Sequence, residues 1–173
     1  MQTDSGRDDS PWIVSTGEQA PEVVAALLKT VPEWFGIEES NTAYVEAARH
    51  LPTYLARPRV PEGLAPGASP GAAPVGVLLA QRHFPGAAEI HLMAVARSHH
   101  RRGVGRALIT TLERDLVADG VTLLQVKTSG PSFEDAGYAK TRLFYEAMGF
   151  APLEELLDLW PTNPCLIMVK VLR

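Results

Sequence analysis

The sequence has little cysteine, and Cys165 is the only one in 173 residues. A single cysteine cannot form a disulfide within the chain or build a cysteine-rich zinc site. Proteins without disulfides are typical of reducing compartments, so the cytoplasm is the expected location. Cys165 lies in an apolar segment, which favours a small buried residue over an acyl-accepting nucleophile.

The sequence also lacks an apolar run long enough to span a bilayer, for which a helix needs about 20 residues. Residues 1–10 are polar and acidic, without an apolar core. They predict neither a signal peptide nor a membrane anchor, but a disordered tail. We therefore expect no membrane partner and one domain over residues 11–173.

An excess of positive charge is absent as well, since the net charge is -4 at pH 7. This balance argues against broad binding to nucleic acid. The hydrophobic content of 46% and the charged content of 21% are those of an ordinary globular protein, which excludes disorder of the whole chain. A local basic cluster over residues 97–106 stands out against the acidic background and requires a separate explanation.

Apolar periodicity predicts a mixed α/β domain with strands at both ends. Pro85 and Gly86 separate two apolar segments and suggest an antiparallel hairpin at the centre of a sheet. The stretch 61–74, rich in Pro, Gly and Ala, is expected to be a connecting loop. Ser40 or Asn41 is the expected N-cap of the second helix. The predicted strands are 12–15, 53–57, 75–81, 89–96, 121–127, 156–160 and 165–171, and the predicted helices begin near residues 21, 41, 104 and 138.

A glycine-containing loop follows the strand 89–96 and opens the third helix. The first amides of a helix lack internal partners and carry partial positive charge, so they bind phosphate well. Gly103 and Gly105 carry no side chains that would keep a pyrophosphate from the backbone. Arg101, Arg102 and Arg106 add positive charge at the same point. This arrangement predicts a diphosphate ligand.

The same loop allows other interpretations. A solvated basic turn before an ordinary helix remains an alternative from the loop alone. A Walker-type loop does not fit because no Gly-Lys-Ser/Thr follows, and a dinucleotide-binding fingerprint would require a third glycine. A nucleic-acid-binding helix start is a further rival, which the overall acidity disfavours.

The segments 92–95, 100–105 and 144–150 together resemble the GNAT acetyltransferase superfamily. Its hallmark, Gln/Arg-x-x-Gly-x-Gly/Ala, is similar to His100-Arg101-Arg102-Gly103-Val104-Gly105, with histidine in the first position. The segment Leu92-Met93-Ala94-Val95 looks like the family's fourth strand, and Phe144-Tyr145-Glu146-Ala147-Met148-Gly149-Phe150 is similar to its Phe/Leu-Tyr-Glu-x-x-Gly-Phe segment. Tyr138 stands where many members have a cofactor-binding asparagine.

The resemblance implies the GNAT fold, an α/β (α+β) architecture in which a mixed, mostly antiparallel sheet of about six to seven strands is flanked by about four helices. It also implies acetyl-CoA (coenzyme A) as the acyl donor, inserted into the sheet between the fourth and fifth strands. The residues it assigns to cofactor binding are Met93, Ala94, Val95, His100, Arg101, Arg102, Gly103, Val104, Gly105 and Arg106.

In the resembling family an amine attacks the thioester directly in a ternary complex, and a tyrosine protonates the departing thiolate. Tyr145 matches that tyrosine. The ordinary pKa of tyrosine, about 10, lies near the thiol value of about 8.5, which suits proton donation. The alternative is that Tyr145 only packs its helix on the sheet. Glu89 and His91 alternate on the strand that faces the thioester, so either is a candidate general base or an exposed strand residue.

The expected acceptor is a primary amine of a small molecule or a protein. Trp34, Phe35, Glu33, Glu38 and Glu39 lie between the first two helices, where an acidic, aromatic rim would suit a cationic amine; a hydrophobic turn with a solvated acidic surface is an equal alternative. His99 and His100 lack a third ligand, so no metal is expected. A non-catalytic acyl-CoA-binding module on the same fold is the main rival function. Homodimers through the C-terminal strands are compatible with the resemblance.

Overall fold

The computed structural model describes residues 10–59 and 71–173, so nearly all of the expected tail and most of the loop 61–74 lie outside the described residues. The strands of the described part form one seven-stranded sheet in the order β1-β2-β3-β4-β5-β7-β6. Neighbouring strands are antiparallel except β4 and β5, which are parallel. The strands are β1 (Trp12–Thr16), β2 (Thr53–Pro58), β3 (Gly76–Phe84), β4 (Ala87–Val95), β5 (Leu123–Ser129), β6 (Ala151–Leu156) and β7 (Cys165–Val171).

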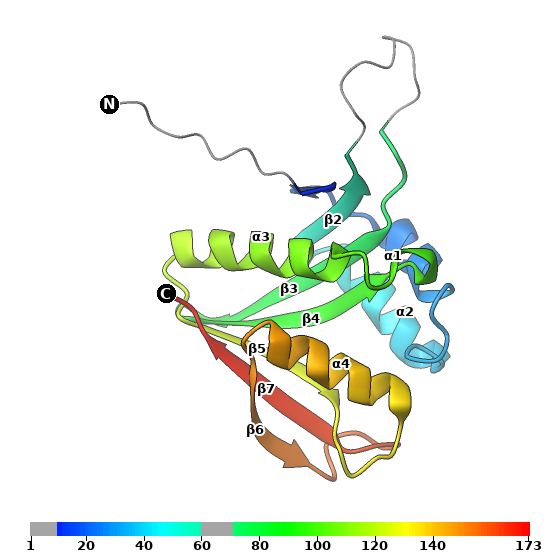
Figure 1. Ribbon diagram of the computed structural model, residues 1–173, viewed down its shortest axis with the longest axis vertical. Helices are drawn as coiled ribbons and strands as arrows, with labels where there is room; N and C mark the ends of the chain where they lie inside the picture. The colour runs from blue at the N-terminus through cyan, green and yellow to red at the C-terminus, as the bar shows by residue number, and fades with distance from the viewer. Residues whose placement is uncertain (1–9, 60–70) are drawn as a thin grey trace.

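The helices cover both faces of the sheet, as Figure 1 shows. α1 (Pro21–Leu28) and α2 (Glu38–Ala47) pack on one face, and their core cluster includes Leu55, Leu92 and Ala94. α3 (Val104–Ala118) and α4 (Ala136–Ala147) share the opposite face. A short 3-10 turn, η1 (Arg97–His99), connects β4 to the loop before α3. The seven strands and four helices confirm the predicted fold class.

α3 follows directly from its sequence pattern. Its apolar residues recur at intervals of three and four, which places them on one side of a helix, and that side is buried against the sheet. Gly120 accepts a positive φ of 77° just beyond the helix and ends it. The buried residues of α3 are Val104, Leu108, Ile109, Leu112 and Leu116.

The feature that positions the site is the separation of β4 from β5. Their parallel pairing runs from Ala87–Leu123 to Ile90–Val126 and then ends, although β4 continues to Val95 and β5 to Ser129. At the same point β4 carries a bulge, because Leu79 pairs with Leu92 whereas Ala80 pairs with Ile90. His91 is therefore the extra residue, and the strand changes phase there.

Two details of the sequence-based assignment were wrong. The strand expected at 156–160 lies earlier in the chain, as β6 (Ala151–Leu156), which pairs with β7. The polar residues of β6 interrupt the apolar pattern by which a strand is predicted. The second helix begins at Glu38 rather than after Ser40 or Asn41, and Asn41 instead donates from Nδ2 to the Phe35 carbonyl at 2.8 Å. Within the described residues, none of the helices is both long and apolar enough to cross a membrane.

Candidate active site

The loop between η1 and α3 presents unpaired backbone amides. Gly103 is the N-cap of α3 with a φ of 84°, and no side chain caps the helix. The first bond of the helix runs from the Ala107 N–H to the Gly103 carbonyl, so the amides of residues 104–106 have no partner within the helix. Arg101 also has a positive φ, 61°, which is unusual for a residue with a side chain. The loop is shaped as an anion site.

Arginine side chains surround these amides. Arg101, Arg102 and Arg106 are exposed, and no ion pair engages them within the described part of the chain. Trp12 supports the loop from β1, because its Nε1–H donates to the Arg102 carbonyl at 2.8 Å. The sequence interpretation did not single out Trp12, since this contact joins residues 90 positions apart.

His100 has a structural partner of its own. Its Nε2–H donates to the Val95 carbonyl at 2.8 Å, and its ring packs edge-to-face on Trp34. A histidine at this position therefore ties the loop to the end of β4. The loop amides remain available to a ligand.

Gly105 allows close packing at the start of α3. A Cβ added there would lie 3.1 Å from the Phe144 ring of α4 and 3.7 Å from the Met93 side chain. The first turn of α3 thus approaches α4 and β4 closely because residue 105 is glycine. This reason differs from the pyrophosphate approach that the sequence suggested for Gly105, and it is compatible with it.

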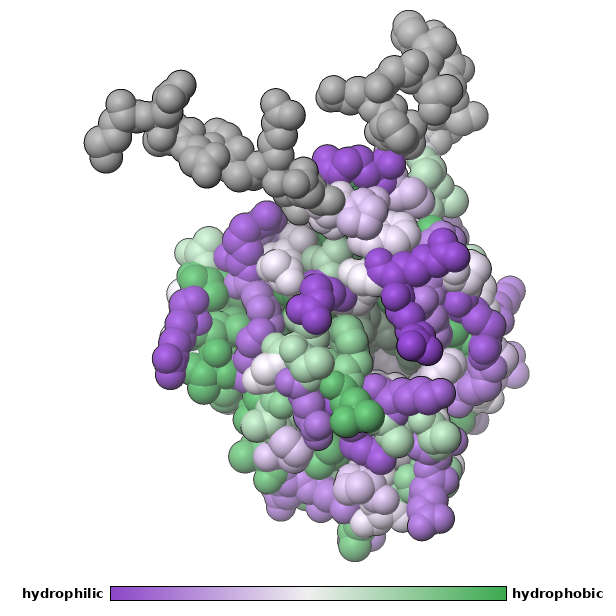
Figure 2. All heavy atoms as spheres, viewed as in Figure 1, coloured by the Kyte–Doolittle hydropathy of each residue, from purple (hydrophilic) through white to green (hydrophobic). Residues whose placement is uncertain are grey.

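The edge of β4 that faces the gap carries free backbone groups. The Ala96 N–H donates to the Val75 carbonyl on the β3 side. Because alternate residues of a strand point to opposite edges, the N–H groups of Met93 and Val95 point toward β5, which has separated there. Figure 2 shows this face hollowed between the start of α3 and α4, with hydrophilic side chains at the rim.

Tyr145 lies on α4 beside the same gap. It is 5% exposed and packs edge-to-face with Phe144 and Phe150. Burial, and to a smaller extent the nearby Tyr44, raises the pKa of the Tyr145 hydroxyl far above its ordinary value. The hydroxyl therefore stays protonated throughout the physiological pH range.

Glu89 is buried in a hydrogen-bonded network on the α2 side of the sheet. Its carboxylate accepts from His83 Nε2 at 2.6 Å, from Gln125 Nε2 at 2.9 Å and from Lys127 Nζ at 3.0 and 3.1 Å. Burial alone would raise the pKa of Glu89, but these hydrogen bonds and the charge of Lys127 outweigh it and hold the pKa below its ordinary value. Glu89 is therefore ionised and fully engaged.

His91 occupies the bulge of β4 and contacts α2. Its ring packs edge-to-face on Tyr44, with 5.6 Å between the ring centroids. Burial lowers the pKa of His91 below its ordinary value, and the charge of Glu89 opposes this only in part. His91 is therefore neutral at pH 7 and can accept a proton. Tyr44, which the sequence did not single out, contacts His91 and lies near both Glu89 and Tyr145. Burial, followed by the charge of Glu89, raises the pKa of Tyr44.

Residues 69–152 match the family model for the acetyltransferase (GNAT) domain. Residues 69–152, just under half of the chain, are therefore similar to a GNAT acetyltransferase domain. Similar folds include a GNAT-family protein from Desulfovibrio desulfuricans (TM-score 0.74, 19% identity, covering 94% of this chain and 99% of that one). Another is the ribosomal-protein-S18-alanine N-acetyltransferase of Escherichia coli (TM-score 0.66, 19% identity, covering 93% of this chain and 94% of that one). A third is an aminoglycoside 6'-N-acetyltransferase complexed with coenzyme A (TM-score 0.67, 18% identity, covering 93% of this chain and 97% of that one). No significant match was found among curated protein sequences.

The residues of the rim between α1 and α2 lie in two different environments. Trp34 and Phe35 are partly buried, whereas Glu38 and Glu39 are exposed in the first turn of α2. Glu33 forms an ion pair with Arg97 of η1. The acidic and aromatic residues expected together thus separate into an exposed acidic helix start and an aromatic loop.

The remaining candidates from the sequence occupy structural positions. Cys165 is buried at the start of β7. His99 packs edge-to-face on Trp12. Within residues 10–59 and 71–173, no group of three or more His, Cys, Asp or Glu side chains is placed to hold a metal ion.

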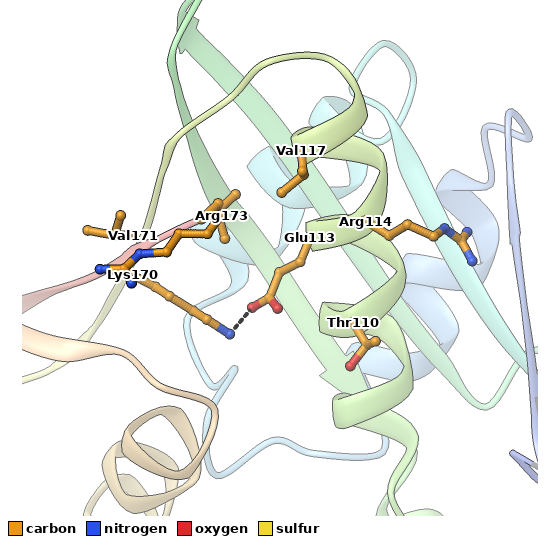
Figure 3. A pocket seen from close by; sticks show the side chains of 8 residues that line it. Thr110, Glu113, Arg114, Val117, Lys170, Val171 and Arg173 are labelled. Atoms are coloured by element: carbon orange, nitrogen blue, oxygen red, sulfur yellow. Dashed lines mark hydrogen bonds and ion pairs between the residues drawn. The ribbon is translucent and has the colours of Figure 1, made fainter.

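A groove of about 410 Å³ lies elsewhere, between the second half of α3 and the end of β7. Figure 3 shows that the Lys170–Glu113 ion pair, with 2.5 Å between Nζ and Oε1, crosses it. The groove contains none of the residues described above, so its size does not make it the candidate site.

We predict that Glu89→Gln lowers the free energy of unfolding by about 2 kcal/mol at pH 7, because the substitution leaves Lys127 and His83 without their acidic partner. The lowered pKa of Glu89 determines how this stabilisation depends on pH. The stabilisation is complete above the unfolded pKa of about 4.3 and is lost as pH falls through the folded value.

Urea unfolding at pH 7 and at about pH 3 measures this difference. Glu113→Gln is the matched control, since it breaks the Lys170 ion pair on the other face. An equal loss for Glu89→Gln at both pH values would contradict the prediction.

Proposed function

We propose that this GNAT domain, over residues 11–173, transfers the acetyl group of acetyl-CoA to a primary amine by direct attack in a ternary complex. The observation that carries the proposal is the uncapped start of α3, which follows β4 where β4 and β5 separate. Phosphate-binding amides and an opening in the sheet thus adjoin each other, as a long diphosphate ligand requires.

The chain's groups suit coenzyme A in charge and shape. The amides of residues 104–106 and the side chains of Arg101, Arg102 and Arg106 would hold the pyrophosphate. The free N–H groups of Met93 and Val95 would face the acetyl carbonyl oxygen, and hydrogen bonds there polarise the thioester. When bound, acetyl-CoA supplies the activated acetyl group.

The acceptor amine must lose a proton before it attacks. For an amine of pKa about 10.4, deprotonation at pH 7 costs about 4.6 kcal/mol. Glu89 and His91 are both candidates for the base, and we propose His91, directly or through water. His91 is neutral and free to accept a proton, whereas Glu89 already accepts four hydrogen bonds and has a lowered pKa. Glu89 then holds Lys127 and His83 in place beside it.

Attack would form the bond from nitrogen to the carbonyl carbon and break the bond from that carbon to sulfur, whose electron pair would leave as a thiolate. The nitrogen would then release its remaining extra proton to solvent, which in turn reprotonates Tyr145 after it has protonated the sulfur. Tyr145 would donate a hydrogen bond to the departing sulfur and deliver its proton as charge develops there. The acceptor is a primary amine of a small molecule or of a protein, since the similar structures include enzymes named for an alanine of a ribosomal protein and for an aminoglycoside.

A panel of primary amines with acetyl-CoA tests the proposal by release of free CoA. We expect release with at least one amine class, and we expect Arg102→Ala to raise the KM for acetyl-CoA about 10-fold with little change in kcat, because a charge-assisted phosphate contact is lost. Arg114→Ala is the matched control, since this exposed arginine lies on α3, beyond the loop that carries Arg102.

The alternatives make different predictions for the same protein. Tight CoA binding without release from any amine would favour a non-catalytic acyl-CoA-binding module. Strongly salt-dependent DNA binding that CoA does not displace would favour a nucleic-acid role for the loop.

A further inference from the structure

The loop between α1 and α2 crosses from the acceptor side of the sheet to the cofactor loop. The Trp34 ring packs edge-to-face on His100, with 5.6 Å between centroids and 65° between planes. The Arg97 guanidinium lies over the same ring, 5.9 Å from its centroid, and also pairs with Glu33. Trp34 is thereby fixed to the segment that continues β4.

The same residue is fixed to the start of α4. The Tyr138 hydroxyl donates to the Trp34 carbonyl at 3.1 Å. A Cβ at Gly137 would lie 3.2 Å from Trp34 Cζ2, so the helix start packs directly on the indole. Tyr138 stands at the position where many family members have asparagine, and here its hydroxyl is used to hold this loop.

These two attachments lie on opposite sides of the gap in the sheet. Residues 97–100 extend β4, residues 136–138 come after β5, and the two strands stop pairing at Ile90–Val126. We propose that Trp34 is a latch that sets the spacing of the two walls of the CoA cleft, and so is a positioning residue for CoA binding. This inference rests on the proposed function.

The latch depends on several modest contacts that converge on one residue, since His100, Arg97 and Gly137 contact the indole and the Tyr138 hydroxyl donates to the backbone carbonyl. An aromatic pair, a cation–π contact and a hydrogen bond are each worth a few-fold in an equilibrium constant. Removal of the ring eliminates the contacts to His100 and Arg97 on one wall and the packing on Gly137 at the other. A ligand that binds between the walls must then restore their spacing, which lowers its affinity. Packing of the loop on α4 alone would carry no such consequence for CoA.

Calorimetric titration with CoA tests the latch in the full chain. We expect Trp34→Ala to weaken CoA binding about 10-fold, and Tyr138→Phe, which removes only one hydrogen bond, about 3-fold. Trp34→Phe keeps a ring and should fall between Trp34→Ala and the wild type. Phe35→Ala is the matched control, because this neighbouring ring packs on Tyr44 of α2 and should leave CoA affinity within about 2-fold.

Fluorine NMR of 5-fluorotryptophan-labelled protein provides a second measurement. The three tryptophans give resonances that single substitutions assign, and the Trp34 resonance should shift when CoA is added. If Trp34→Ala does not fold, the latch is still tested by the CoA affinities of Trp34→Phe and Tyr138→Phe and by the Trp34 resonance. Wild-type affinity in Trp34→Phe and Tyr138→Phe with an unmoved Trp34 resonance would overturn the latch. Failure of the wild-type protein to bind CoA would instead refute the proposed function, and the latch with it.

Discussion

Replacing Tyr145 with phenylalanine should lower kcat about 100-fold, because general acid assistance of this kind contributes about 100- to 10,000-fold. The substitution removes one hydroxyl and keeps the ring that packs on Phe144 and Phe150. CoA affinity should change little, since the pyrophosphate contacts lie on the α3 loop. The KM for acetyl-CoA should therefore remain near the wild-type value while kcat falls.

The raised pKa of Tyr145 refines this role. A donor with an unperturbed pKa of about 10 would begin to ionise in mildly alkaline solution, and kcat would then fall. Because burial keeps the Tyr145 hydroxyl protonated, we expect no loss of kcat from this group between pH 7 and about pH 9. In the proposed mechanism, its hydrogen bond to sulfur would stabilise the developing charge before the proton itself moves.

Steady-state kinetics with the acceptor from the amine panel measures both effects. Tyr54→Phe is the matched control, because Tyr54 is also buried, and burial together with Asp115 raises its pKa to about 12. Its loss should leave kcat unchanged. Wild-type kcat in Tyr145→Phe would remove the hydroxyl from the mechanism and leave Tyr145 as a packing residue.

Much of the fold can be predicted from the local sequence pattern. The predicted strand 165–171 coincides with β7, and the pattern of α3 was clear because its apolar residues repeat at helical spacing. The strand β6 was misplaced because Glu154 and Glu155 occupy it and interrupt the apolar alternation that marks a strand. Its identity comes from pairing with β7, which is a tertiary property.

The sequence predicts the residues of the site better than the contacts between them. The sequence pointed to Glu89 without its three partners, two of which lie 36 and 38 positions away on β5. It likewise gave no sign that Trp34 and Tyr138 meet across 104 positions. Such pairings depend on the order of strands in the sheet, and only the resemblance supplied that order in advance.

Replacing His91 with asparagine should lower kcat/KM about 100-fold at pH 7, since the acceptor amine loses the group proposed to take its proton. The lowered pKa of His91 gives the pH dependence in the wild type. Activity is retained while His91 is neutral and falls as the pH drops through its pKa, which lies below the ordinary value of about 6.5. This fall in activity at low pH is the acidic limb of the pH profile, and His91→Asn should lack it.

The deficit should also shrink as pH rises toward the pKa of the amine, because solvent then deprotonates the acceptor without help. His83→Asn is the matched control, since it removes another histidine beside Glu89 but none that faces Tyr44. Glu89→Gln adds a further check: loss of its charge removes a contribution that raises the pKa of His91, so the acidic limb should move to lower pH. An acidic limb that stays in His91→Asn and disappears in Glu89→Gln would transfer the role of base to Glu89.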